Sequence, residues 1–150
     1  MSLVTITRKI EFDAGHRIPD HKSKCRSVHG HRYVLEATAT GEVKPTRGES
    51  DDGMVLDFGD LKAIMNELIH DEWDHAFLVA DTDTEMQTAL SHLDTVRTRW
   101  VVLDFIPTVE NLARHAFDVL KPRLVEYDLN LVSVRLYETP NCWADVFSEQ

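Results

Sequence analysis

Two histidines flank a glycine in the stretch CRSVHGHRY, which runs from Cys25 to Tyr33. If this stretch is extended, His29 and His31 project from one face of a strand and can bind the same metal ion. His16 can add a third nitrogen if the strand before it pairs with this one as a hairpin. Three neutral imidazoles with an open fourth position are typical of a catalytic zinc site. The alternative is that backbone hydrogen bonds satisfy these histidines without a metal.

Cys25 offers a second kind of chemistry, because a thiol near a metal ion and basic residues loses its proton more readily. It can be an acid/base or a nucleophile, a metal ligand, or an inert buried thiol. Five basic residues and one acid lie between Ala14 and Val34. This local positive charge indicates either a solvated loop or a site for a small anionic substrate. Cys142 has no such neighbours, and we expect an inert free thiol there.

Two further carboxylates, Asp74 and Glu138, could take part in chemistry. Asp74 directly precedes His75, and a carboxylate can hold an imidazole in one tautomer. Glu138 shares strand parity with three apolar residues, Val132, Val134 and Leu136. It therefore either points inward, where ligand N–H groups could satisfy it, or lies on a strand end that twists into solvent. The remaining histidines have no comparable neighbours, and we expect surface or core positions for His21, His70, His92 and His115.

These residues must be positioned by strands, which the alternation of apolar and polar side chains predicts. Residues 3–14 and 31–43 alternate in this way, as half-buried strands do. A short strand is predicted at 54–58, after the turn-forming stretch KPTRGESDDG. Further strands are predicted at 99–105 and 131–138.

Helices are predicted from apolar residues that recur every three or four positions. Such a stripe comprises Leu61, Ile64, Met65, Leu68 and Ile69. This helix should end near 71–78, and a short helix is predicted at 84–93. Thr108 is the predicted N-cap of a second main helix that has Pro122 near its end. Glu110 lies in its first turn, where it either stabilises the helix dipole or contacts a ligand.

The order of these elements predicts an α+β fold. We expect a four-stranded, mainly antiparallel sheet with two main helices on one face, formed by residues 1–150 as a single domain. Because the edges of such a sheet are usually covered or paired, we also expect oligomerisation through the sheet.

Composition excludes several classes of function. The net charge of −10 argues against general binding to nucleic acids or to membrane surfaces. The first residues alternate instead of forming the apolar block of a signal peptide, and no run approaches the ~20 apolar residues of a membrane span. We therefore expect a cytoplasmic protein with free thiols.

Six motifs together carry a specific family resemblance over nearly the whole chain. In order they are FDAGHR, CRSVHGH, MVLDF, DHAFL, PTVENLA and YETPN. This set resembles the family of 6-pyruvoyltetrahydropterin and 6-carboxytetrahydropterin synthases. The resemblance implies the tunnelling fold (T-fold), in which antiparallel sheets of several subunits close into a barrel. It also implies a homohexamer, built as a dimer of trimers with active sites between subunits.

The resemblance further implies a role for each candidate residue. The zinc ligands would be His16, His29 and His31, and the catalytic residues Cys25, Asp74 and His75. Glu138 would anchor a pterin ring, with Thr108 and Glu110 lining the same pocket. Zinc would bind the side-chain hydroxyls of 7,8-dihydroneopterin triphosphate, while Cys25 moves a proton on that side chain. The basic segment would then face a triphosphate.

The spacing between the cysteine and the histidine pair distinguishes the two kinds of synthase in this family. Three residues lie between Cys25 and His29, which looks like the bacterial 6-carboxytetrahydropterin synthases of the queuosine pathway. These release acetaldehyde and triphosphate to leave 6-carboxy-5,6,7,8-tetrahydropterin. This sequence departs from the pattern of the compact bacterial members in segment 76–106, which is longer here. The alternatives are a 6-pyruvoyltetrahydropterin synthase and a zinc- or pterin-binding protein without turnover.

Overall fold

The computed structural model describes residues 2–93 and 96–149, so positions 94 and 95 of the predicted 76–106 segment lie outside the described residues. The strands are β1 (Val4–His16), β2 (His29–Gly41), β3 (Ala76–Ala80), β4 (Trp100–Leu103), β5 (Asn130–Thr139) and β6 (Cys142–Phe147). The helices are α1 (Phe58–Met65), α2 (Asp71–Trp73), α3 (Thr84–Ser91) and α4 (Val109–Val125). A 3₁₀ turn, η1, covers Lys24–Arg26, and a π-helical turn, η2, covers Asn66–His70 between α1 and α2.

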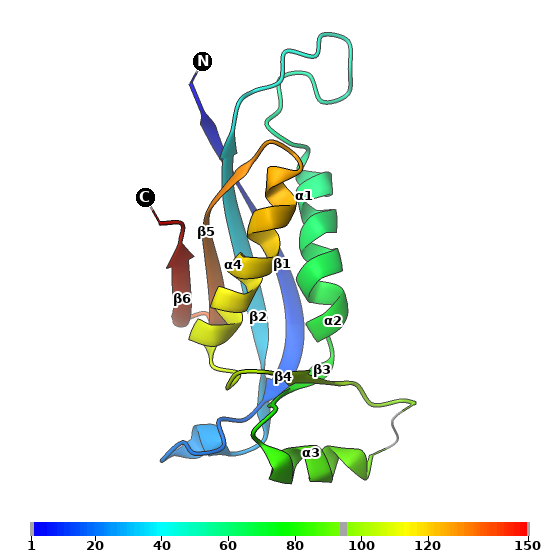
Figure 1. Ribbon diagram of the computed structural model, residues 1–150, viewed down its shortest axis with the longest axis vertical. Coiled ribbons are helices and arrows are strands. Elements are labelled where there is room, and N and C mark those ends of the chain that lie inside the picture. The colour runs from blue at the N-terminus through cyan, green and yellow to red at the C-terminus, as the bar shows by residue number, and fades with distance from the viewer. Residues whose placement is uncertain (1, 94–95, 150) are drawn as a thin grey trace.

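The predicted α+β class is confirmed, but the predicted four-stranded antiparallel sheet is wrong. The described strands form one six-stranded mixed sheet in the order β4-β3-β1-β2-β5-β6 (Figure 1). Strand β3 runs parallel to β1, and β4 runs parallel to β3. Strand β6 returns antiparallel to β5 after a two-residue turn at Pro140 and Asn141. The short strand β3 was missed because it directly follows α2 with little turn signal between them, and β6 was missed although Pro140 and Asn141 mark a turn before it.

The predicted strand at 54–58 is also wrong. Val55 and Leu56 are buried, but they lie in irregular chain. The carboxylate of Asp57 accepts a hydrogen bond from the backbone N–H of Gly59 at 2.6 Å, and it thereby caps α1. Because an N-cap carboxylate satisfies one of the unpaired N–H groups at a helix start, this stretch begins a helix.

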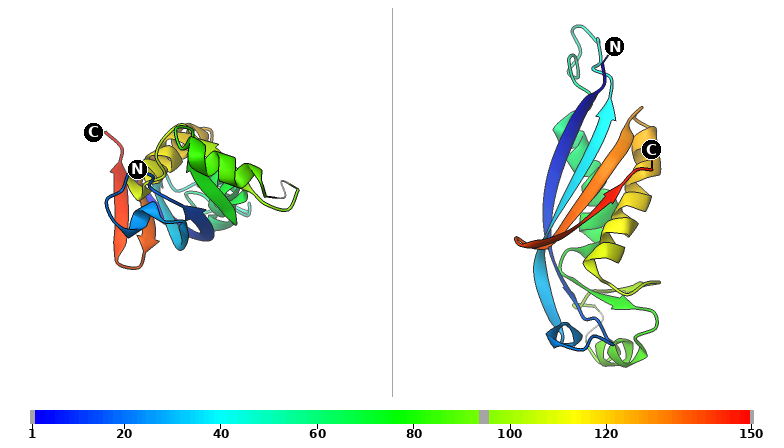
Figure 2. Two further views of the ribbon diagram at one scale, coloured as in Figure 1. Left: turned by 90° about the horizontal axis from the view of Figure 1, so that it is seen from below. Right: turned by 90° about the vertical axis from the view of Figure 1, so that its left-hand side faces the viewer.

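Helices α1, α2 and α4 cover one face of the sheet (Figures 1 and 2). The predicted stripe of the first helix is buried at Leu61, Ile64, Met65 and Ile69. The predicted N-cap of α4 is also confirmed, because Thr108 Oγ1 accepts a hydrogen bond from the backbone N–H of Asn111 at 3.2 Å. The core between the sheet and these helices is continuous. No helix in 2–93 or 96–149 combines the length and apolar character needed to cross a membrane.

A bulge in the β2–β5 pairing affects the parity of β5. Thr38 is opposite Ser133, but the next residue, Ala39, is opposite Leu131. As a result Leu131 is buried in place of Val132, whereas Leu136 is buried as predicted. The β5–β6 pairing has a second irregularity at Glu138, but Glu138 still lies on the face that carries the helices, because it lines a hollow together with the first turn of α4.

Helix α3 is fastened to the end of β1 by a buried ion pair. The Arg17 guanidinium donates to both carboxylate oxygens of Asp83, at 2.7 Å and 2.5 Å. The same carboxylate caps α3 by accepting from the backbone N–H of Met86. Charged, bidentate contacts of this kind fix geometry as well as supplying energy. The predicted 84–93 helix is thus held beside the strand end that carries His16.

Candidate metal centre and adjoining hollows

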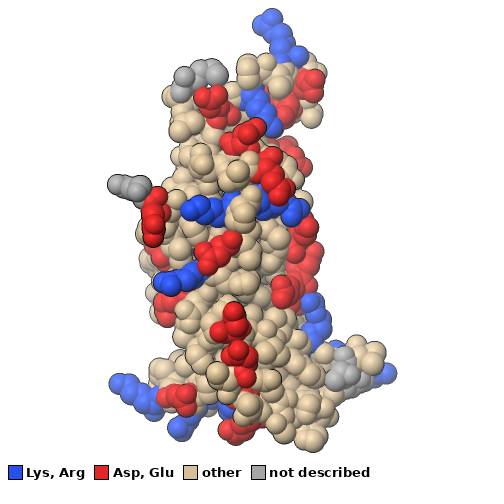
Figure 3. Space-filling view, in the orientation of Figure 1, with Lys and Arg blue, Asp and Glu red and all other residues tan. Residues whose placement is uncertain are grey.

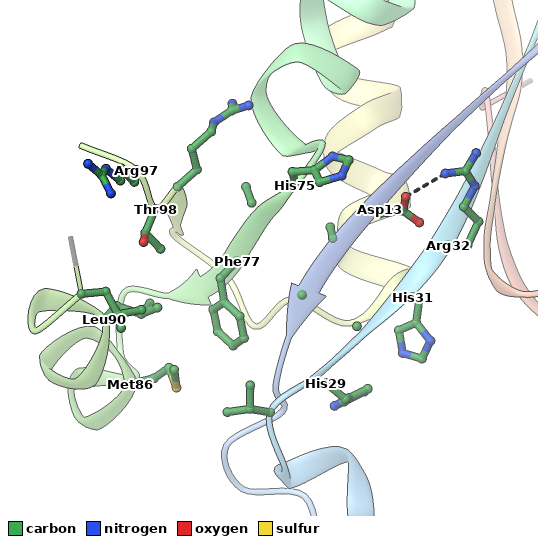
Figure 4. Close-up of a pocket in the computed structure, with 17 residues that line it drawn as sticks. Asp13, His29, His31, Arg32, His75, Phe77, Met86, Leu90, Arg97 and Thr98 are labelled. Atoms are coloured by element: carbon green, nitrogen blue, oxygen red, sulfur yellow. Dashed lines mark hydrogen bonds and ion pairs between the residues drawn. The ribbon is translucent and has the colours of Figure 1, made fainter. Parts of the chain in front are cut away.

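The paired ends of β1 and β2 bring three imidazoles together. His16 pairs directly with His29, and Ala14 pairs with His31, as the predicted hairpin requires. One ring nitrogen from each histidine lies within 4.8 Å of one nitrogen of the other two. His29 and His31 project from β2 at its end (Figure 4). This geometry agrees with the three-nitrogen site expected from the alternation of side chains.

The hydrogen bonds of His16 and His29 indicate that their free nitrogens are acceptors. His16 Nδ1 lies 2.7 Å from the carbonyl oxygen of Pro107, and His29 Nδ1 lies 2.6 Å from that of Ser27. Because a carbonyl oxygen only accepts, both protons sit on Nδ1 and both Nε2 atoms carry lone pairs. The two Nε2 atoms face each other at 3.1 Å. Two lone pairs repel at this distance unless a cation lies between them.

A metal ion bound by both nitrogens resolves this repulsion. Two nitrogens about 2.1 Å from one tetrahedral ion lie roughly 3.4 Å apart, close to the observed separation. The Nδ1–carbonyl bonds are also the outer contacts that commonly fix metal-binding histidines in one tautomer. The donor set therefore fits a metal that prefers imidazole ligands.

Burial favours the neutral form of His16 and His31, which is the form that binds metals. The pKa of His16 is lowered to about 4, mainly by burial. The hydrogen bond to Pro107 raises this pKa, whereas the charges of His29 and His31 lower it. Burial also lowers the pKa of His31, and Glu138 partly offsets this. His31 Nε2 is buried and makes no hydrogen bond to the described residues, so it is available as a ligand atom.

A hollow of about 210 Å³ adjoins the metal centre, and we call it the Cys25 hollow. It brings together five residues singled out from the sequence, His16, Cys25, Thr108, Glu110 and Glu138. Ile18, His21 and Val109 complete its lining. Thr108 and Glu110 reach it from the first turn of α4, Glu138 from the end of β5, and Cys25 from η1. The hollow thus joins a thiol, two carboxylates and the metal centre.

Glu138 is oriented toward the imidazoles. One carboxylate oxygen lies 3.7 Å from His31 Nε2 and the other 4.0 Å from His16 Nε2. Its side chain is 22% exposed, and no donor among the described residues hydrogen-bonds to it. Because a partly buried carboxylate needs donors, its acceptor sites are available to a ligand in the hollow.

His21 lines the Cys25 hollow, although its sequence neighbours suggested only a surface or core position. The loop between β1 and β2 folds back on itself, because the Ile18 N–H donates to the carbonyl of Cys25 at 2.9 Å. This closure brings His21 next to the hollow. The available signal was its place between His16 and Cys25, but the conformation of a loop cannot be obtained from periodicity.

Asp74 and His75 form the pair expected from their adjacency. Asp74 Oδ2 lies 2.8 Å from His75 Nδ1, and Asp74 Oδ1 accepts from the backbone N–H of Asp13. Burial raises the pKa of Asp74, but these hydrogen bonds outweigh it and leave the pKa below its ordinary value. His75 has a φ of 59° and its backbone N–H donates to the Asp13 carbonyl at 2.6 Å. The ionised carboxylate is therefore held in place to orient the imidazole.

The Asp74–His75 pair does not meet Cys25 within one chain. His75 lines a larger hollow of about 790 Å³, with Gly15, Gly30 and Phe77 among its residues (Figure 4). We call it the His75 hollow. The two glycines alternate with the buried side chains of their strands, so they face away from α1 and α4. Cys25 and His75 thus lie at different hollows of the molecule.

Gly30 lies between the two histidines for a steric reason, and this leads to a prediction. A Cβ at Gly30 would lie 2.9 Å from the backbone oxygen of Ala14, which cannot move without disturbing the β1–β2 ladder. We expect Gly30→Ala to lower the free energy of unfolding by about 1 to 3 kcal/mol. Urea titration measures this, with Arg32→Ala as the control because Arg32 is exposed on the same face. Equal losses in both variants would contradict the steric explanation.

Comparison with known proteins gives consistent matches. The family described as 6-pyruvoyl tetrahydropterin synthase matches residues 5–149. The 6-carboxy-5,6,7,8-tetrahydropterin synthase of Rickettsia conorii is 38% identical and aligns with 96% of this chain and 100% of its own. The protein of the same name from Haemophilus influenzae is 31% identical, over 93% of this chain and 96% of its own.

Solved structures agree with the fold. The 6-pyruvoyl tetrahydropterin synthase of Caenorhabditis elegans superposes with a TM-score of 0.69 at 27% identity, covering 99% of this chain and 98% of its own. A protein from Wolinella succinogenes superposes with a TM-score of 0.81 at 22% identity, covering 99% of this chain and 100% of its own. The second likeness concerns the fold alone.

Proposed function

The chain belongs to the 6-pyruvoyl tetrahydropterin synthase family, and we propose that it is a zinc-dependent 6-carboxytetrahydropterin synthase. The reaction converts 7,8-dihydroneopterin triphosphate to 6-carboxy-5,6,7,8-tetrahydropterin and releases acetaldehyde and triphosphate. The observation that carries this proposal is the cluster of His16, His29 and His31, of which His16 lines the same hollow as Cys25 and Glu138. The names of the curated relatives and the spacing of Cys25 from His29 favour the 6-carboxy product.

Zinc is the proposed ion because three neutral imidazoles are a common catalytic donor set for it. Held by His16, His29 and His31, it supplies a Lewis acid for the hydroxyls of the substrate side chain and makes the neighbouring C–H bonds more acidic. Cys25 then takes and returns a proton on that side chain as a general acid/base. Its place on the loop beside the metal centre supports this role.

The partner of Cys25 is proposed to come from a neighbouring subunit. Asp74 and His75 form a ready proton-transfer pair, and the His75 side chain is 76% exposed. Because Cys25 lines a different hollow, a second copy that presents its Cys25 loop to the His75 hollow would complete the set. We therefore propose a homo-oligomer, a hexamer of two trimers, whose sheets join into a barrel.

Glu138 is proposed to hold the pterin ring, with Thr108 and Glu110 beside it. The 2-amino and N3–H groups of a pterin are paired donors, and the carboxylate of Glu138 has unused acceptor sites facing the hollow. The ring would then be anchored at the wall formed by β5 and α4, next to the imidazoles.

Glu138→Gln tests this anchor. The substitution keeps the volume but replaces one acceptor oxygen with a donor that opposes the pterin N–H groups. We expect pterin binding to weaken by about 2 to 4 kcal/mol, with unchanged zinc content. Calorimetric titration with biopterin measures the first effect and metal analysis the second. Glu126→Gln, an exposed change after α4, is the control. Equal affinities in wild type and Glu138→Gln would show that Glu138 does not bind the pterin ring.

Product analysis tests the reaction itself. Purified protein is incubated with 7,8-dihydroneopterin triphosphate, and the products are identified by mass spectrometry. We expect 6-carboxy-5,6,7,8-tetrahydropterin together with acetaldehyde. A 6-pyruvoyl product with an intact carbon chain would assign the second candidate, 6-pyruvoyltetrahydropterin synthase, which the name of the Caenorhabditis elegans relative favours. Unchanged substrate would leave a zinc- or pterin-binding protein without turnover.

The setting of the enzyme completes the proposal. We propose that residues 1–150 act as one domain, in the cytoplasm and in queuosine biosynthesis, without nucleic-acid or membrane partners. Segment 76–106 is proposed to shape the His75 hollow, since Phe77, Met86 and Leu90 all line it.

A further inference from the structure

The loop between β1 and β2 forms one wall of the Cys25 hollow. Two backbone hydrogen bonds shape it, from Ile18 N–H to the Cys25 carbonyl at 2.9 Å and from His21 N–H to the Ile18 carbonyl at 3.1 Å. They place His21 on the same hollow as Cys25 and Glu138. The proposed acid/base and pterin anchor do not involve this imidazole.

The tautomer of His21 is fixed by its neighbour Ser23. The backbone N–H of Ser23 donates to His21 Nδ1 at 3.0 Å. A nitrogen that accepts a hydrogen bond carries no proton, so the proton of the neutral ring is on Nε2. Nε2 makes no hydrogen bond to any described residue and is therefore a free donor. A donor next to the hollow calls for an acceptor on the ligand.

The charge of the loop indicates what kind of acceptor. Lys22, Lys24 and Arg26 are exposed, and none of them forms an ion pair within the described residues. Asp20 is the only acid between Ile18 and Val28. Lys and Arg side chains gather over this loop at the lower left of Figure 3. The three basic residues belong to this loop but do not line the hollow, whereas Glu110 and Glu138 line it from α4 and β5, so positive and negative charge come from different elements.

From this asymmetry we infer that His21 is a substrate-binding residue that donates its Nε2–H to the phosphate chain. The inference rests on the proposed function, in which one ligand carries both a donor-rich pterin and a triphosphate. The pterin belongs at the carboxylates, which accept from its N–H groups, and the phosphates belong at the loop, because the carboxylates repel them and the basic residues of the loop attract them. The substrate then lies across the hollow, with its reacting side chain between Cys25 and the metal centre.

His21→Leu, which removes the donor and retains bulk, tests the inference on the zinc-loaded oligomer. We expect binding of inorganic tripolyphosphate to weaken about tenfold or more, since a charge-assisted hydrogen bond is lost. The KM for the substrate should rise by a similar factor while kcat changes less than about threefold. Binding of biopterin, which has no phosphate, should be unchanged. His21→Gln, which keeps an N–H donor near the position of Nε2, should restore most of the affinity.

Controls separate this inference from the proposed function. His92→Leu removes an exposed imidazole outside the hollow and should leave tripolyphosphate binding as in wild type. Zinc is measured in every sample, because tripolyphosphate also binds metal ions. Equal tripolyphosphate affinity in wild type and His21→Leu, or an equal loss of biopterin affinity, would overturn the inference. Should the product assay fail, tripolyphosphate titration still decides the role of His21, since it requires no turnover.

Discussion

Turnover should fall by about a hundredfold or more in Cys25→Ala, the scale of losing a proton-transfer group. Cys25 lines the hollow beside the metal centre, but it is not one of the three clustered ligands. Zinc content, circular dichroism and biopterin affinity should therefore stay at wild-type values. Steady-state kinetics measures the loss, and it should appear in kcat more than in KM because the thiol acts on the reacting atoms.

Cys142→Ala is the matched control for this experiment. Cys142 is the other free thiol, and it is exposed at the start of β6. Its removal should change turnover less than about twofold, as surface substitutions usually do. Near-normal activity in Cys25→Ala would return Cys25 to the reading of an inert thiol and remove the acid/base from the mechanism.

His29→Ala should lose most of the zinc and with it all measurable turnover. Two nitrogens then remain of three, and the loss of affinity should be at least about a hundredfold, since even an outer-shell partner contributes up to that much. His29 is only partly buried at the end of β2, so the fold should survive. Metal analysis after dialysis measures the occupancy, and far-ultraviolet circular dichroism monitors the fold.

His92→Ala controls for the removal of an imidazole as such, because His92 is exposed after α3. It should retain about one zinc per chain. The assignment of the metal centre would be abandoned if a variant with His16, His29 and His31 all replaced still carried full zinc.

Periodicity predicted the parts of the fold that have a long repeat. Strands β1 and β2 alternate over 13 residues each, and α4 carries an apolar stripe over 17 residues. Strand β4 confirms the strand predicted at 99–105, but β3, with five residues, was predicted as the end of the preceding helix. In so short a run a buried strand cannot be distinguished from the end of a helix. The parallel pairing of β3 with β1 is also a long-range contact, which no local pattern encodes.

Part of the candidate site could also be predicted from local sequence patterns, and part could not. The imidazole cluster follows from strand parity and hairpin pairing, and Glu138 faces the helices as its parity with Leu136 predicted, despite two irregularities in the pairing of β5. The pairing of Asp74 with His75 follows from their adjacency. The role of His21 depends on the hydrogen bonds of a loop, which local patterns do not reveal. The placement of Cys25 and His75 on different hollows required the complete sheet order.

The hairpin that carries the metal ligands also affects the order in which parts of the chain fold. His16 and His29 are separated by only 13 positions, so closing the loop between them costs little chain entropy. Glu138 reaches the same place only after β5 has paired with β2, across most of the chain. Low contact order favours early formation, so the ligand hairpin should form before the pterin wall during folding. A nascent chain would then be able to take up its metal before the substrate pocket exists, and metal supply would act on folding as well as on catalysis.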